Sequence, residues 1–278
     1  MNQPIGSSPI EVFIDAGNTL GEGPIWWKKR NLLVWVDILE CKIYAADGSG
    51  TIVHTYEMQE PVGCVFEMND GSLVAGCQSG LRSVPNGELI ARLPDASPNI
   101  RVNDGKVDPW GNLVLGTMGF PEPRDGAGTL WRWDGQQFNA LKDSVTIPNG
   151  MVWRPDQSLL LFIDTPTQSV ETYRYGPKTE RLGEPLSSSD LSQFNGDPDG
   201  MCEGPNGDLF IAMWDGFGFL QIGEDKEIKF HNIPLRRPTS FCFVPHLSKM
   251  FITSAKDDLT GELGAVMTFG IETGRQSL

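Results

Sequence analysis

Three observations predict that this chain folds as an all-β protein, a six-bladed β-propeller. Six short apolar runs resemble one another, and successive runs begin 40 to 49 residues apart. Most runs follow a turn and precede a second strand-like segment, and 32 glycines and 20 prolines lie scattered among these segments. Repeats of this length with several strands each are typical of propeller blades, and no segment has apolar residues at helical spacing over three turns. The runs are LVWVD (33–37), LVAGC (73–77), LVLGT (113–117), LLFID (160–164), LFIAM (209–213) and MFITS (250–254).

The repeats leave no room for a linker or a second domain, so we expect a single domain over residues 1–278. One blade is too small to bury both of its faces, and the blades must therefore pack around an axis. We expect the N-terminal dozen residues to supply a strand that completes the last blade and closes the ring. A β-sandwich is the alternative for an all-β chain, but six similar units argue against it.

Charge and hydropathy exclude several partners. The chain carries 22 basic and 36 acidic side chains and has a net charge of −14, so it would repel a phosphate backbone, and no nucleic acid partner is expected. Its longest apolar run, residues 32–38, falls far short of the ~20 residues that a membrane helix needs, so no membrane association is expected. The N-terminus lacks the pattern of a secretory signal, and the five cysteines lack CxxC spacing. Both features predict a cytoplasmic protein with free thiols.

A second pattern lies about ten residues before each apolar run, where the preceding strand should begin. In five of the six copies a variable residue is followed by glycine and then by apolar residues. The innermost strand of each propeller blade starts at one mouth of the central channel, so equivalent positions form a ring around the axis. The glycine lets the backbone approach closely or adopt a positive φ. The expected ring consists of Glu22, Val62, Asp104, Asn149, Asp199 and Thr239.

The ring residues predict a metal site. Each Asn-Gly or Asp-Gly pair taken alone would indicate only a turn. In a common register, however, three carboxylates and an amide crowd around one point, which is costly unless a cation compensates. These oxygens are hard donors, so one divalent cation is expected, calcium first, with manganese, magnesium, zinc or iron as alternatives. So few protein ligands leave coordination positions open to water or substrate, which favours catalysis.

Other residues that often form sites lie elsewhere in the repeat. We expect surface or packing roles for the histidines, His54, His231 and His246. We expect small, buried packing roles for the cysteines of the innermost strands, Cys64, Cys202 and Cys242. The eight tryptophans, with Trp26, Trp27 and Trp153 among them, are expected to pack between blades and not to form a platform for a sugar.

Several segments resemble those of the senescence marker protein/gluconolactonase/luciferin-regenerating enzyme family, from about residue 12 to residue 269. The segments are LGEGPIWW (20–27), RVNDGKVDPWGNLVLGTMG (101–119), IPNGMVW (147–153), DPDGMCEGPNGDLFIAMW (197–214) and RPTSFCFVP (237–245). Members of that family are six-bladed propellers with one divalent cation in the channel, and most of its enzymes hydrolyse aldonolactones.

The resemblance also implies roles for single residues. It implies that Glu22, Asn149 and Asp199 bind the metal, that Asp199 is the general base, and that Arg101 and Asn103 bind the substrate. Family members often carry an acidic residue directly after the GTM segment, whereas here Gly119-Phe120-Pro121 precede Glu122. This departure leaves the role of Glu122 open.

The expected function is that of a metal-dependent hydrolase that opens sugar lactones, chiefly aldonolactones, to aldonic acids. The cation would polarise the lactone carbonyl, and Asp199 would either take the proton of the attacking water or orient a metal-activated hydroxide. Arg101 and Asn103 would hydrogen-bond the sugar, and Asp104 would contact a water near the metal.

The expected partner is a small-molecule sugar lactone, and the sequence predicts no oligomeric state. Two other functions are possible on the same scaffold: an organophosphate-type hydrolase and a non-enzymatic cation-binding propeller. A covalent route is not expected, because the chain has no GxSxG segment and no recognisable Cys/His pair.

Overall fold

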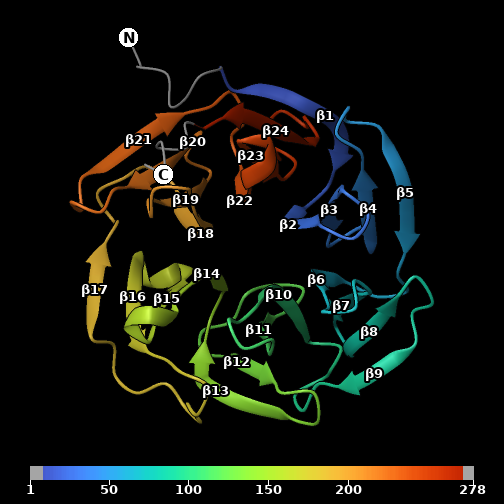
Figure 1. Ribbon diagram of the computed structural model, residues 1–278, viewed down its shortest axis with the longest axis vertical. Coiled ribbons are helices and arrows are strands. Elements are labelled where there is room, and N and C mark those ends of the chain that lie inside the picture. The colour runs from blue at the N-terminus through green and yellow to red at the C-terminus, as the bar shows by residue number, and fades with distance from the viewer. Residues whose placement is uncertain (1–8, 272–278) are drawn as a thin grey trace.

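The computed structural model describes residues 9–271, which form six four-stranded antiparallel sheets around a central axis (Figure 1). This confirms the six-bladed β-propeller. Each sheet is one blade, and its first strand in sequence lies nearest the axis in five blades. The expected domain of residues 1–278 also includes residues 1–8 and 272–278, which lie outside the described residues.

The first three blades follow the chain from its N-terminal part. They consist of β2 (Gly21–Trp27), β3 (Leu32–Asp37), β4 (Lys42–Ala46) and β5 (Ile52–Glu57); β6 (Val62–Glu67), β7 (Leu73–Cys77), β8 (Gly80–Val84) and β9 (Leu89–Arg92); and β10 (Ile100–Val107), β11 (Leu113–Gly119), β12 (Gly128–Trp133) and β13 (Phe138–Val145). We call them blades 1, 2 and 3.

Blades 4, 5 and 6 complete the circle. They consist of β14 (Pro148–Arg154), β15 (Leu159–Asp164), β16 (Ser169–Arg174) and β17 (Ser187–Asp190); β18 (Asp197–Glu203), β19 (Leu209–Trp214), β20 (Gly218–Ile222) and β21 (Ile228–Asn232); and β22 (Pro238–Val244), β23 (Lys249–Ser254), β24 (Gly264–Gly270) and β1 (Glu11–Asn18). Within the described part of the chain, three single-turn 3-10 helices lie between strands, at Pro155–Gln157, Thr165–Thr167 and Pro245–Leu247.

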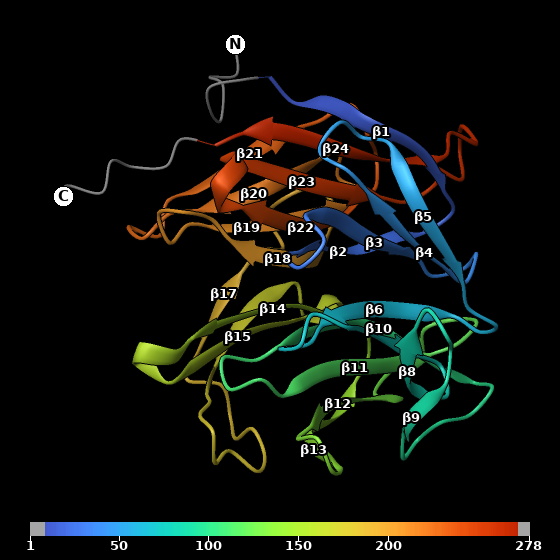
Figure 2. The ribbon, with the colours of Figure 1, turned by 45° about the vertical axis from the view of Figure 1, so that its right-hand side comes forward.

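The two ends of the described chain close the ring together. β1 pairs antiparallel with β24, with Glu11 opposite Thr268, and Figures 1 and 2 both show the two strands side by side. The prediction that an N-terminal strand completes the last blade is therefore confirmed. Its predicted position is too early, since the strand begins only at Glu11 and runs to Asn18. As the outermost strand, β1 is exposed at half of its residues and lacks the continuous apolar run by which the inner strands are recognised.

The hydrophobic core lies between blades. Its buried residues form six clusters among the described residues, and each cluster joins two neighbouring blades. The second strand of a blade contributes to both of its interfaces, which is why β3, β7 and β11 are buried along their whole length. Strands buried on both faces are apolar without alternation, and this explains the six runs in the sequence.

The cysteines and three named tryptophans occupy the expected positions. All five cysteines are free, and Cys64 and Cys202 are buried on the innermost strands β6 and β18. Cys242, on the innermost strand β22, is only partly buried, so the prediction of burial is wrong for this residue. Trp26, Trp27 and Trp153 each pack in or against a cluster between two blades. Among the described residues, no helix is long and apolar enough to cross a membrane.

Each innermost strand carries an irregularity at its ring residue. In all six blades the pairing of the first two strands shifts register at the ring residue or directly beside it, as between Glu22 and Ile25 and between Pro198 and Met201. Such a bulge redirects a side chain and tightens the local twist. Gly23, with φ +52°, allows one of these bulges, and Gly63 allows another, because a Cβ there would lie 2.4 Å from the carbonyl oxygen of Val102.

Candidate functional site

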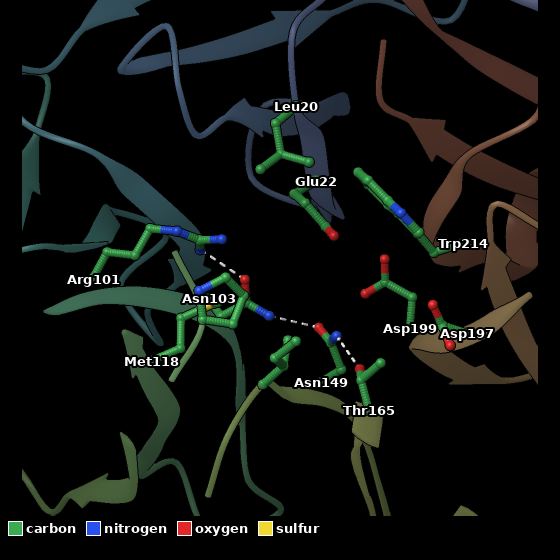
Figure 3. Close-up of a pocket in the computed structure, with 12 residues that line it drawn as sticks. Leu20, Glu22, Arg101, Asn103, Met118, Asn149, Thr165, Asp197, Asp199 and Trp214 are labelled. Carbon is green, nitrogen blue, oxygen red and sulfur yellow. Dashed lines mark hydrogen bonds between the residues drawn. The ribbon is translucent and has the colours of Figure 1, made fainter. Parts of the chain in front are cut away.

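Five of the six predicted site residues border one cavity. Glu22 from β2, Arg101 and Asn103 from β10, Asn149 from β14 and Asp199 from β18 line a space of about 240 Å³. Glu22, Asn149 and Asp199 turn toward this space from three different blades (Figure 3). Residues distant along the chain therefore meet at one mouth of the channel.

The sixth predicted residue, Asp104, does not line this cavity. Its side chain is buried beside the other two acids and raises their pKa values by its charge. Glu122 is exposed and also lies outside the lining, whereas the next residue, Pro123, is part of it.

Most of the lining comes from three repeated positions of the blades. Ring residues supply one set, and the residues two places before them supply another: Leu20, Ile147 and Asp197. The third set directly follows the apolar runs: Met118, Thr165 and Trp214. The second strand of each blade is antiparallel to the first, so it ends at the mouth where the first begins. Neither of these two sets is apparent from the strand starts alone, although the same register applied to the ends of the apolar runs indicates the third set.

The three ring carboxylates share one local arrangement. One oxygen of Glu22 accepts a hydrogen bond from the backbone N–H of Gly23 at 2.9 Å, and one of Asp104 accepts from that of Gly105 at 2.6 Å. The backbone of Gly200 stabilises the Asp199 carboxylate in the same way. The second oxygen of Asp104 is buried without a partner among the described residues. Each acid is thus oriented by its glycine and keeps one oxygen available.

The site holds more negative charge than its surroundings balance. Burial, with the charge of Asp104, raises the pKa of Glu22 to about 8. Burial and the charge of Glu22 raise the pKa of Asp199 well above its ordinary value, and burial also raises that of Asp104. Burial lowers the pKa of Arg101 to about 10, although both Glu22 and Asp199 favour its charged form. None of the ion pairs found among the described residues includes one of these three acids.

A chain of hydrogen bonds sets the orientation of the Asn149 amide. The Thr165 hydroxyl donates to the carbonyl of Pro198 at 2.8 Å, so it accepts from Asn149 Nδ2, also at 2.8 Å. Asn149 Oδ1 consequently faces the other way and accepts from Asn103 Nδ2 at 2.8 Å.

The same chain continues to the arginine. Asn103 Oδ1 accepts a hydrogen bond from Arg101 Nη1 at 2.7 Å. Figure 3 shows this sequence of bonds along one side of the cavity. The network places an amide oxygen beside the two carboxylates of the cavity and holds the Arg101 guanidinium in place.

A lysine lies close to the three acids. Lys106 follows Asp104 by two residues on β10, and its Nζ donates to the backbone carbonyl of Met201 on β18. This contact connects blade 3 with blade 5 across the axis. The Lys106 charge favours the ionised forms of Asp104 and Glu22.

The residues fit a hard divalent cation. Two buried carboxylates and an oriented amide oxygen face one cavity, and these are the donor types that calcium and similar ions prefer. Within residues 9–271 no three His, Cys, Asp or Glu side chains come together as a metal site. A cation here would therefore need the Asn149 oxygen in addition to Glu22 and Asp199.

Comparison with known proteins gives relatives along nearly the whole chain. The family model of the SMP-30/Gluconolactonase/LRE-like region matches residues 20–256. Regucalcin of Xenopus laevis is 31% identical over 271 residues, which cover 92% of this chain and 89% of that protein. The 6-deoxy-6-sulfogluconolactonase of Pseudomonas putida is 30% identical over 264 residues, covering 91% of this chain and 89% of the relative. A solved structure of regucalcin from Agrobacterium tumefaciens, described as a calcium-binding protein, has a TM-score of 0.82 and 25% identity and covers 94% of this chain and 93% of that one.

Proposed function

The chain belongs to the SMP-30/gluconolactonase/LRE-like family, and on this premise we propose that it hydrolyses sugar lactones to aldonic acids with the help of one divalent cation. The observation that carries the proposal is the convergence of Glu22, Asn149 and Asp199 on one cavity, with buried negative charge that no ion pair of the described residues offsets. The lactonase named among the relatives supports the substrate class.

Glu22, Asn149 and Asp199 would hold the cation, and calcium is the first candidate because all three donors are oxygens. A cation bound there supplies a Lewis acid for the lactone carbonyl and favours the negative charge that develops on its oxygen. The Thr165–Asn149–Asn103 bonds support this assignment, since they keep the Asn149 amide oxygen turned toward the carboxylates.

Asp199 is the proposed general base. Water attacks the carbonyl carbon, and Asp199 accepts one of its protons. When the ring C–O bond breaks, the leaving oxygen takes up a proton, so lactone and water give one hydroxy acid. The position of Asp199 in the cavity lining beside Glu22 and Asn149 supports this role, and the same position would let it orient a metal-activated hydroxide instead.

Arg101 and Asn103 would orient the sugar. Arg101 uses one nitrogen on Asn103 and on the carbonyl of Val102, and its remaining N–H groups can reach ligand oxygens. Asp104 lies outside the lining, so its proposed contact is with a water near the cation and not with the sugar itself.

The test is a panel of aldonolactones assayed on chelated protein, with calcium, manganese, magnesium and zinc restored one at a time. We expect chelation to abolish activity and at least one cation to restore it. Glu22→Gln should lower kcat/KM by more than about 100-fold and weaken calorimetric cation binding, because it removes a charged ligand. Glu57→Gln, on the exposed outer strand β5, is the matched control and should change neither quantity.

Three outcomes would contradict the proposal. Full lactonase activity of metal-free Glu22→Gln would remove the cation from the mechanism. Hydrolysis of phosphotriesters without hydrolysis of any lactone would assign the site to the other substrate class, and cation binding without either activity would indicate a binding propeller.

A further inference from the structure

One wall of the cavity is aromatic, and the proposed chemistry does not use it. Trp214 ends β19 and lines the cavity together with Glu22 and Asp199. Its partner across the strand pair is Asp197, two residues before Asp199. Figure 3 shows the indole beside both carboxylates. Trp214 is only partly buried, whereas Trp35 and Trp27 are buried between blades.

The indole is supported from outside the cavity by an arginine. The guanidinium carbon of Arg237 lies 4.7 Å from the centre of the Trp214 ring. Arg237 is not among the residues that line the cavity, so it contacts the indole from behind. This is a cation–π contact, which is favourable over an indole in particular.

Three residues from two segments of the chain hold Arg237 in that position. Its Nε donates to Asp215 at 2.6 Å, and its Nη1 donates to Asp258 at 2.6 Å and to the backbone carbonyl of Lys256 at 3.0 Å. Asp215 directly follows Trp214 and adopts a φ of 59°, a strained conformation for a residue other than glycine. The local backbone therefore places the aspartate where it anchors the arginine behind its neighbouring tryptophan.

The lining has two kinds of surface. Arg101, Asn103 and Asn149 present hydrogen-bonding groups, whereas Trp214, with Leu20, Met118, Pro123 and Ile147, presents apolar surface. A sugar lactone has a matching division, since its oxygens lie at the edge of the ring and its C–H groups form the faces. Aromatic rings in binding sites pack against such apolar faces, while a few polar groups fix the orientation.

We propose that Trp214 is a specificity-determining residue, on which the C–H face of the lactone ring packs. Arg237 is the positioning residue that holds the indole in the orientation for this contact. The inference rests on the proposed function in so far as the ligand is a sugar lactone. It differs from the expectation that the tryptophans pack between blades and form no platform for a sugar.

The kinetic test uses D-glucono-1,5-lactone at saturating calcium with Trp214→Ala, Trp214→Phe and Arg237→Met. We expect Trp214→Ala to raise KM about tenfold with kcat changed less than about threefold, because the wall binds substrate without touching the reacting atoms. Trp214→Phe should lie between wild type and Trp214→Ala, and Arg237→Met should raise KM by a smaller factor. Calcium affinity measured by calorimetry should stay unchanged in all three and so report an intact fold and cation site.

The matched control is Trp110→Ala. Trp110 is 40% exposed in the turn between β10 and β11, at the opposite mouth, where it packs against Tyr175. This variant should leave KM and kcat unchanged. An unchanged KM in Trp214→Ala, or a loss confined to kcat, would overturn the proposal.

A second test needs no catalysis. Sodium gluconate, the product of the same lactone, is titrated while tryptophan emission is recorded. We expect a change in wild-type emission that disappears in Trp214→Phe and persists in Trp110→Phe. A change that survives in Trp214→Phe, or the absence of any change in wild type, would overturn the proposal. If wild type hydrolyses no lactone, the proposed function fails in the kinetic assay, while the gluconate titration still decides the role of Trp214.

Discussion

At the residue scale, the site is a group of buried charges whose sum is negative. The negative charges of Glu22, Asp104 and Asp199 repel one another, and the cationic groups within residues 9–271 that favour their ionised forms are Arg101 and Lys106. Lys106 is the more informative of the two, because it lies beside the acids but outside the cavity lining. Its charge must repel a cation at the site while it favours the ionised carboxylates.

Lys106→Met is therefore expected to tighten cation binding and to destabilise the metal-free protein. Removing one positive charge increases the repulsion among the three acids in the metal-free folded state, which lowers its stability. The same change makes binding of a divalent cation more favourable, because the cation offsets that repulsion. Calorimetry should show calcium affinity increased by about tenfold, and thermal unfolding with chelator should show a lower Tm.

The control for this variant is Lys178→Met, which removes an exposed lysine from the turn after β16. It changes the net charge equally, so any effect of overall charge would appear in both variants. Weaker or unchanged calcium binding in Lys106→Met would contradict the electrostatic argument.

At the element scale, the decisive feature is the irregular start of each innermost strand. The register shifts in all six blades occur at or beside the ring residue, and the glycines there allow close contact between neighbouring blades. Gly63 is the clearest example, because its α-carbon faces the backbone of Val102 in the next blade.

Gly63→Ala is expected to destabilise the fold by forcing blades 2 and 3 apart. The added Cβ would lie 2.4 Å from the Val102 carbonyl oxygen, which belongs to the backbone and cannot rotate away. Overpacking of this kind costs about 1–3 kcal/mol, which corresponds to a Tm lower by roughly 2–10 °C for a chain of this size. Gly48→Ala, where a Cβ would meet no atom within 4 Å, is the control. Equal Tm values for the two variants would show that the blades adjust freely.

At the scale of the whole molecule, the closed ring forces the acids together. Six clusters of buried side chains join each blade to the next, and β1 with β24 completes the last blade. Folding therefore brings Glu22 and Asp199 to one cavity whether or not a cation is present. The repulsion between the acids therefore lowers the free energy of unfolding of the whole molecule, because it is absent from the unfolded chain.

The metal-free protein is accordingly expected to lose stability as the pH rises from 6.5 to 8. Burial and Asp104 raise the folded-state pKa of Glu22 to about 8, whereas its ordinary value is 4.5. In this interval the folded state keeps a proton that the unfolded state has lost, so the free energy of unfolding falls by up to about 1.4 kcal/mol per pH unit.

A second titrating group, His231, affects the pH dependence of stability outside this interval. Burial lowers the pKa of His231 to about 4 from 6.5, and this makes stability rise with pH, but only below 6.5. Thermal unfolding with chelator between pH 6.5 and 8 should thus show a falling Tm, and calcium should raise Tm more at pH 8 than at pH 6.5. Glu22→Gln should flatten the slope, and Glu57→Gln should keep it. A Tm that rises with pH in metal-free wild type would contradict the raised pKa.

Much of the architecture followed from the sequence alone, because repetition is visible without coordinates. Second strands are buried on both faces, so they appear as six apolar runs, and their spacing determined the number of blades. The same register placed Glu22, Asn149 and Asp199 at equivalent strand starts, which is enough to predict that they meet. The edge strand β1 was located less accurately, since an exposed strand carries no continuous apolar run.

Only the tertiary structure decided which neighbours complete the site. Asp104 occupies a ring position by register, yet it lies outside the cavity lining, which β10 reaches with Arg101 and Asn103 instead. Trp214 borders the cavity because β19 runs antiparallel to β18 and ends at the mouth where β18 begins. Its contact with Arg237 connects loops of blades 5 and 6 that are more than twenty residues apart in the sequence. The register of the strands repeats along the chain and can therefore be recognised in the amino-acid sequence. The direction of a side chain at a bulge, and the contact behind it, depend on how neighbouring blades pack.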